Sequence, residues 1–81
     1  MKPRKTPPGD KNIIGTRVTA IRKAKGMKQK EFLARLQTAG LDISPTSLSR
    51  LEGQDRLVQD YELLAIAQAL EVTVAELLGS K

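Results

Sequence analysis

The residues best suited to chemistry on a ligand lie at positions 43–53, which read ISPTSLSRLEG. Ser44 can accept a hydrogen bond at a helix N-terminus, and Pro45 suits the first helical position because no N–H donor is needed there. Two leucines then recur at helical spacing, and Gly53 supplies a stop. The pattern predicts a helix over residues 45–52 of about two turns, with a small, hydroxylated exposed face. Its Thr, Ser and Arg side chains suit contact with phosphates and base edges.

The composition excludes several kinds of active site. The chain has 81 residues with no Cys and no His, which removes disulfides, thiolate metal sites, the commonest metal ligand and the commonest general base. Glu52 and Asp55 lie close in sequence, but an acidic pair without a His, a metal-ligand spacing or a Gly-rich phosphate loop is no active site. We therefore expect no enzyme, no metal, no cofactor and no small-molecule ligand.

The charges are divided unequally along the chain. Residues 1–30 carry ten Lys or Arg and one Asp, whereas residues 31–81 carry four Lys or Arg and eight Asp or Glu. A basic block of this kind is typical of nucleic-acid binding, although a solubilising tail gives the same composition. No apolar run approaches the roughly 20 residues of a membrane span, and the basic start lacks the apolar stretch of a secretory signal. We expect a cytoplasmic protein that contacts no membrane.

The chain is predicted to be one all-α domain of five helices behind a disordered arm. Residues 1–11 are rich in Pro and Lys and cannot bury a core, so they form a basic N-terminal arm, and residues 12–81 form the folded domain. Apolar residues at helical spacing predict the helices, with Asn12 as a candidate cap of the first and a capping box of Thr73 and Glu76 for the last. The expected helices cover residues 13–25, 29–39, 45–52 and 74–78, and a further helix before the last has Asp60 at or near its cap and apolar residues up to Leu70.

In these features the chain resembles the helix-turn-helix domains of phage repressors and Cro proteins, the Xre family. The resemblance covers about residues 13–79 and rests on several short motifs in order. They are Ile14-Gly15, Ile21-Arg22-Lys23, Gly26, Gln29, Glu31, residues 44–52, residues 63–67, Ala69-Leu70 and residues 72–78. It implies a five-helix repressor-like domain in which helices 29–39 and 45–52 form the reading unit, with the latter in the DNA major groove.

The resemblance also implies roles for individual residues. Those that approach base edges are Thr46, Ser47, Ser49 and Arg50. Those near the DNA backbone are Arg22, Gln29, Ser44 and Pro45. Apart from the resemblance, Lys28 and Lys30 at a helix N-terminus and the cation Arg56 are expected at phosphates, and Gln54 is also assigned to the backbone. Arg22 and Glu52 match a pair that joins the first helix to the end of the recognition helix.

The chain departs from the family pattern at three places. The link between the second and third helices is longer than the family's usual one-glycine turn, because residues 37–42 replace it, so we expect an extra turn on the second helix. Leu33 stands where a small residue is usual, which predicts a wider spacing of the helix pair. Pro45 stands where a long polar reader is common, so base reading shifts to Thr46, Ser49 and Arg50.

The leading functional hypothesis is a sequence-specific regulator of transcription that binds double-stranded DNA, a repressor acting by promoter occupancy. The alternatives are an antitoxin-type autoregulator, a restriction-system controller, a protein-binding adaptor that uses the same helices, and non-specific nucleic-acid binding led by the arm. One short recognition helix reads few base pairs, so we expect a homodimer on half-sites about 34 Å apart. Its interface is predicted on the last helix, at Val74, Leu77 and Leu78, and so small an interface could hold only on DNA.

Overall fold

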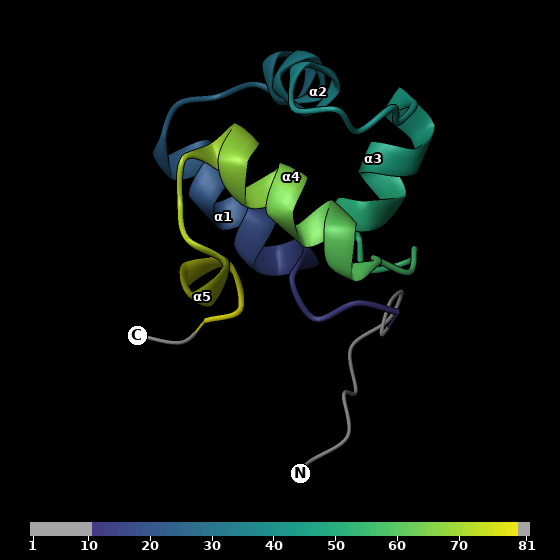
Figure 1. Cartoon of the computed structure of the whole chain (residues 1–81), viewed down its shortest axis with the longest axis vertical. Helices are drawn as coiled ribbons and strands as arrows, with labels where there is room; N and C mark the ends of the chain where they lie inside the picture. The colour runs from purple at the N-terminus through teal and green to yellow at the C-terminus, as the bar shows by residue number, and fades with distance from the viewer. Residues whose placement is uncertain (1–10, 80–81) are drawn as a thin grey trace, which may run out of the picture.

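The computed structural model describes residues 11–79, and this part of the chain is all-α. Its five helices are α1 (Gly15–Ala24), α2 (Gln29–Thr38), α3 (Pro45–Glu52), α4 (Asp60–Leu70) and α5 (Val74–Leu77) (Figure 1). The predicted five-helix fold is confirmed. The predicted arm lies, apart from Lys11, outside the described residues.

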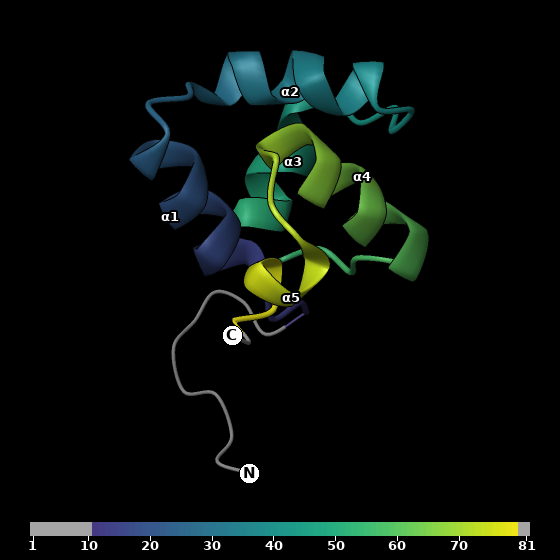
Figure 2. The same ribbon diagram turned by 60° about the vertical axis from the view of Figure 1, so that its left-hand side comes forward.

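The helices pack around an aliphatic core. α2 lies across one end of the group formed by α1, α3 and α4, while α5 lies near the other end (Figure 2). All five helices or their flanking residues contribute fully buried side chains. The largest of these are Phe32, Ile14, Leu36, Leu48, Leu51, Ile66, Leu70, Leu77 and Val18. Phe32 is the chain's single phenylalanine, so branched aliphatic side chains supply most of the interior, as the composition predicts.

The predicted helix boundaries are confirmed where local hydrogen bonding sets them. Ser44 Oγ accepts from the backbone N–H of Ser47 at 3.1 Å, which caps α3. Thr73 and Glu76 form the expected capping box of α5, with each side chain accepting from the other residue's backbone N–H. Gly40 takes a left-handed φ of +97° directly after α2, a conformation that favours glycine. These local signals therefore fix the C-terminal end of α2 and the N-terminal ends of α3 and α5.

One helix start differs from the expectation, and the start of α4 near Asp60 agrees with it. α1 begins at Gly15 because the side chain of Asn12 accepts from the Gly15 N–H at 2.8 Å, so residues 12–14 form a turn. Asn12 thus accepts from the first N–H of the helix, although Ile14 and not Asn12 is the N-cap residue. For α4, Gln59 is the N-cap, and Glu62 accepts from its backbone N–H at 3.0 Å.

The connection between α2 and α3 carries the additional residues noted in the sequence. α2 runs to Thr38, so part of the additional stretch is helical, and residues 39–44 complete the link. Leu41 and Ile43 are buried and tie this link to the core. Within residues 11–79, no helix has both the length and the apolar character needed to cross a bilayer.

Candidate nucleic-acid interface

α3 presents a polar face to solvent opposite its buried leucines. Thr46, Ser49 and Arg50 are exposed, and their spacing of three and four residues places them on one side of the helix. Ser47 is half-buried, and its backbone N–H is used by the Ser44 cap. Arg50 takes part in no ion pair among the described residues, so its guanidinium is available to a ligand with acceptor groups.

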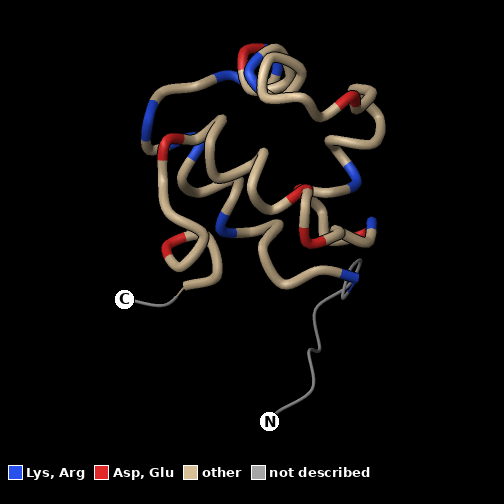
Figure 3. The backbone as a smooth tube through the Cα atoms, viewed as in Figure 1, with Lys and Arg blue, Asp and Glu red and all other residues tan. Residues whose placement is uncertain are grey.

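The first turn of α2 adds positive charge beside α3. Lys28 is the N-cap of α2 and Lys30 lies in its first turn; both side chains are exposed. Figure 3 shows Lys and Arg along the connection from α1 to α2 and at the start of α2. A helix N-terminus carries a partial positive charge and unsatisfied N–H groups, so it favours anions such as phosphate. Exposed lysines at this end strengthen that preference.

A buried ion pair joins α1 to the end of α3. Arg22 Nε lies 2.9 Å from Glu52 Oε2, and Arg22 Nη2 donates to Glu52 Oε1 at 3.0 Å. The two side chains are only 10% and 8% exposed. Arg22 Nη1 also donates to the carbonyl of Met27 at 2.9 Å, just before α2. The predicted pair is confirmed, and it fixes α1, the start of α2 and the end of α3 relative to one another.

The pair of Arg22 and Glu52 also contacts Gln29, which the sequence analysis predicts to lie near the DNA backbone. Gln29 Nε2 donates to Glu52 Oε1 at 3.3 Å, and the hydroxyl of Thr19 donates to the same oxygen at 3.3 Å. Glu52 is therefore an acceptor for three side chains from α1 and α2. The side chains of Arg22 and Gln29 point into this network, so their first role is to position the two helices.

Gly15 allows α1 to approach the end of α3 closely. A Cβ atom at this position would lie 2.5 Å from the Leu51 carbonyl oxygen and 2.9 Å from that of Glu52. Backbone oxygens cannot move aside as a flexible side chain can, so only glycine fits this contact. Asn12 strengthens the same junction because its amide donates to the carbonyls of Leu51 and Arg56 at 3.1 and 2.8 Å.

Two residues expected near the DNA backbone have internal partners. Gln54 is buried, and its amide donates to the carbonyl of Asn12 at 3.2 Å. This corrects the expectation for Gln54, whose side chain is turned away from solvent. Arg56 is half-buried and forms two hydrogen bonds to Glu62, at 3.0 and 2.9 Å. These bonds hold the pKa of Glu62 below its ordinary value and raise the pKa of Arg56.

The expected dimer residues do not share one surface. Leu77 is fully buried, which corrects its assignment to an interface, because a side chain inside the monomer core cannot contact a partner. Val74 is half-buried against the core. Leu78 is 42% exposed and lines a hollow with Ile13 and Val58. Leu64 of α4 is 65% exposed.

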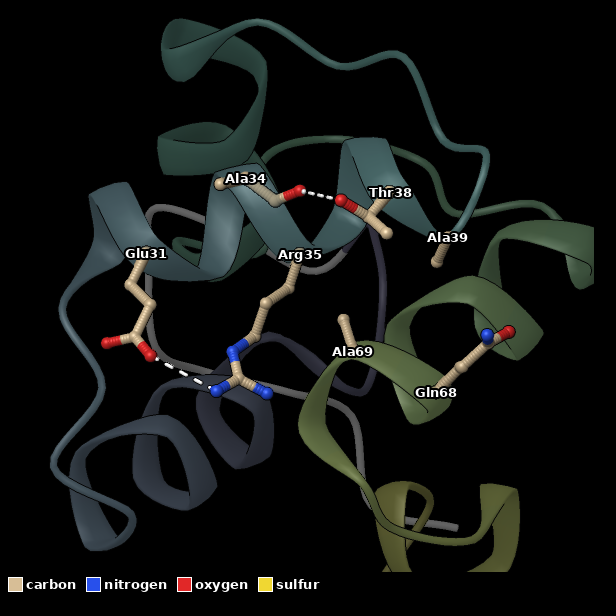
Figure 4. A pocket seen from close by; sticks show the side chains of 7 residues that line it. All are labelled: Glu31, Ala34, Arg35, Thr38, Ala39, Gln68 and Ala69. Atoms are coloured by element: carbon tan, nitrogen blue, oxygen red, sulfur yellow. Dashed lines mark hydrogen bonds and ion pairs between the residues drawn. The ribbon is translucent and has the colours of Figure 1, made fainter.

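Another hollow lies between α2 and α4, and its lining does not indicate a ligand. Residues of α2 and α4 and Ala39, which follows α2, line it (Figure 4). Its two charged side chains, Arg35 and Glu31, pair with each other at 3.2 Å, and Arg35 also pairs with Glu71 at 3.4 Å. Within the described part of the chain, no three carboxylate side chains gather closely enough to hold a metal ion.

Comparison with known proteins identifies one protein family. The family model of the Cro/C1-type helix-turn-helix DNA-binding domain matches residues 17–81. Neither a curated protein nor a solved structure matches the chain. The matched span contains all five helices except the first residues of α1, including the whole of the α2–α3 unit.

Proposed function

The chain belongs to the Cro/C1-type helix-turn-helix DNA-binding domains, and we propose that it is a sequence-specific repressor that works by occupying a promoter. It is a DNA-binding regulator by family, and α2 and α3 form its helix-turn-helix. The observation that carries the proposal is the polar face of α3, where Thr46, Ser49 and Arg50 are exposed beside the basic start of α2. In the cytoplasm, such a protein would meet its operator directly.

We assign different roles to the two groups of side chains. Thr46, Ser47, Ser49 and Arg50 would contact base edges, with Arg50 the only long donor among them. A bidentate pair between arginine and guanine discriminates by about 1–3 kcal/mol. Lys28, Lys30 and Ser44 would lie along phosphates. Gln29, Arg22 and Arg56 would lie near the DNA backbone while each stays bonded to a carboxylate of the protein. The lysines supply affinity without sequence preference.

Selection from a random duplex library tests the proposal directly. The full-length protein is incubated with the library, and bound duplexes are recovered and sequenced. We expect enrichment of one motif with two-fold symmetry. Recovery of unrelated sequences would instead support non-specific binding, and recovery of none would contradict DNA binding altogether.

Two matched variants then separate base reading from phosphate contact. Arg50→Ala should relax the preference at one base pair in each half-site, because it removes a base-directed donor. Lys28→Ala should weaken binding to all duplexes about equally and reduce the slope of log K against log salt by about one. Unchanged selected motifs for Arg50→Ala would show that this side chain contacts only the backbone or solvent.

A homodimer is the second part of the proposal, and exposed apolar side chains are available for its interface. Several large apolar residues are exposed on the monomer. They are Ile13, Leu57, Tyr61, Leu64 and Leu78. Ile13 and Leu78 line the same hollow, and we propose that a second copy covers it. These residues extend the expected interface beyond α5.

Binding to full and half operators tests the dimer. Leu78→Glu should reduce cooperative binding to a two-fold operator and leave binding to a single half-site unchanged. Leu57→Glu serves as a second probe of the exposed apolar residues. Equal losses on both duplexes would place Leu78 in the monomer core and contradict this interface.

A further inference from the structure

A hollow of about 340 Å³ lies between α2 and α3. It is lined by the first turn of each helix and by two leucines below them. We call it the α2–α3 hollow; its residues are Gln29, Lys30, Leu33, Pro45 and Leu48. Leu33, which stands where a small residue is usual in the family pattern, is one of these leucines. The inference drawn below rests on the DNA-binding function proposed above.

The walls of the α2–α3 hollow offer few hydrogen bonds. Leu48 is fully buried and Leu33 is half-buried against the core, so the floor is apolar. Pro45 forms the exposed side and has no backbone N–H to donate. The amide of Gln29 already donates to Glu52 at 3.3 Å. The hollow therefore suits an apolar group and does not suit a polar base edge.

The rim of the hollow suits an anionic ligand that carries such a group. Lys30 lines the rim, Lys28 is exposed next to it, and both lie at the positive end of α2. Thr46 follows Pro45 directly on α3, and Ser49 lies one turn further on the same side. An apolar group in the hollow would thus belong to a molecule that also presents phosphates to α2 and polar edges to α3.

Among the four bases, only thymine carries an apolar group in the major groove, its C5-methyl. We propose that the α2–α3 hollow receives the C5-methyl of one thymine in each half-site, so that Pro45 and Leu33 read this base by shape. Pro45 has no backbone N–H with which to recognise a base, and in this proposal it contributes to specificity through the shape of the hollow.

Deletion of single methyl groups from the DNA tests this inference. Each thymine of the selected operator is replaced in turn by deoxyuridine, which lacks the methyl and keeps the same pairing. Burial of one methyl-sized group is worth about a fourfold change in affinity. We expect one position per half-site at which uracil weakens binding by about fourfold, measured at constant salt, with smaller effects elsewhere. At that position, 5-methylcytosine should also bind better than cytosine.

Protein variants then locate the methyl. Pro45→Ser removes the ring that forms one wall, and it should bring the ratio of thymine to uracil affinity close to one. Lys28→Ala is the matched control, because it should weaken both duplexes and leave the ratio unchanged. Thr46→Ser removes the methyl group of the exposed residue next to Pro45 and should also leave the ratio unchanged.

The outcomes separate this inference from the proposed function. A selected motif without any methyl-sensitive thymine would overturn the inference and leave sequence-specific binding intact. A ratio lost in Thr46→Ser but kept in Pro45→Ser would move the methyl contact to Thr46 and likewise overturn it. If selection yields no motif, sequence-specific DNA binding is contradicted, and the inference that rests on it is contradicted as well.

Discussion

Replacement of Glu52 by alanine is expected to destabilise the domain more than any change to its other ion pairs. The variant would leave the guanidinium of Arg22 nine-tenths buried with only the Met27 carbonyl as partner. Removing one partner of a buried pair costs about 3–5 kcal/mol, whereas an exposed pair contributes about 0–1 kcal/mol. Since the Arg22 and Glu52 side chains are 10% and 8% exposed, we expect a loss of about 3 kcal/mol.

The assay is urea unfolding followed by far-UV circular dichroism, applied to Glu52→Ala, Arg22→Ala and the double variant. The pair of Arg35 and Glu71 is the control, with a distance of 3.4 Å and exposures of 42% and 71%. Its coupling energy in the same cycle should be below about 0.5 kcal/mol. Glu52→Gln separates charge from packing, because it keeps the shape and still leaves Arg22 uncompensated. A loss below about 1 kcal/mol for Glu52→Ala, or equal coupling in the two pairs, would refute the reasoning.

Three further changes probe single contacts. Gly15→Ala should lower the free energy of unfolding by about 1–3 kcal/mol, because its Cβ would lie 2.5 Å from the Leu51 carbonyl oxygen; an unchanged thermal midpoint would contradict the close approach. Glu71→Gly should stabilise the domain by about 1 kcal/mol, because residue 71 has a left-handed φ of 59°; Glu71→Ala is the control and should bring no gain. The lowered pKa of Glu62 means that its carboxylate stabilises the fold above the ordinary value of 4.5, and that this contribution is lost as pH falls through the lowered pKa. Glu62→Gln should therefore be less stable than the native chain at pH 7, with a gap that closes below pH 4.5; a constant gap from pH 7 to pH 3 would contradict the pairing with Arg56.

Helix positions and caps could be predicted because they depend on residues close in sequence. The limits of α3, its Ser44 cap and the Thr73 capping box all follow from side chains within four residues of each other. The joining pair of Arg22 and Glu52 is separated by 30 residues, and only the family resemblance indicated it. Its burial and its further contacts with Met27 and Gln29 depend on how three segments pack.

The predictions for Leu77 and Gln54 were wrong because, in short segments, periodicity does not decide whether a side chain faces the core or the solvent. α5 has four residues, so nearly every position is compatible with either the core or the surface, and Leu77 is buried. Gln54 follows α3 with a left-handed φ of 64°, and this backbone turn carries its amide inward to Asn12. The local sequence does not predict this left-handed turn, because residue 54 is a glutamine and not a glycine or an asparagine.

The network around Glu52 affects how DNA-binding variants are interpreted. Arg22 and Gln29 are expected near the DNA backbone from the sequence, yet both direct side-chain donors at Glu52. Gln29 keeps a second amide N–H, so it can support α3 and contact a phosphate at the same time. A loss of binding in variants of either residue would therefore combine displacement of α3 with loss of a contact. Lys28 and Lys30 have no ion-pair partner among residues 11–79, so the effects of their removal report on the DNA alone.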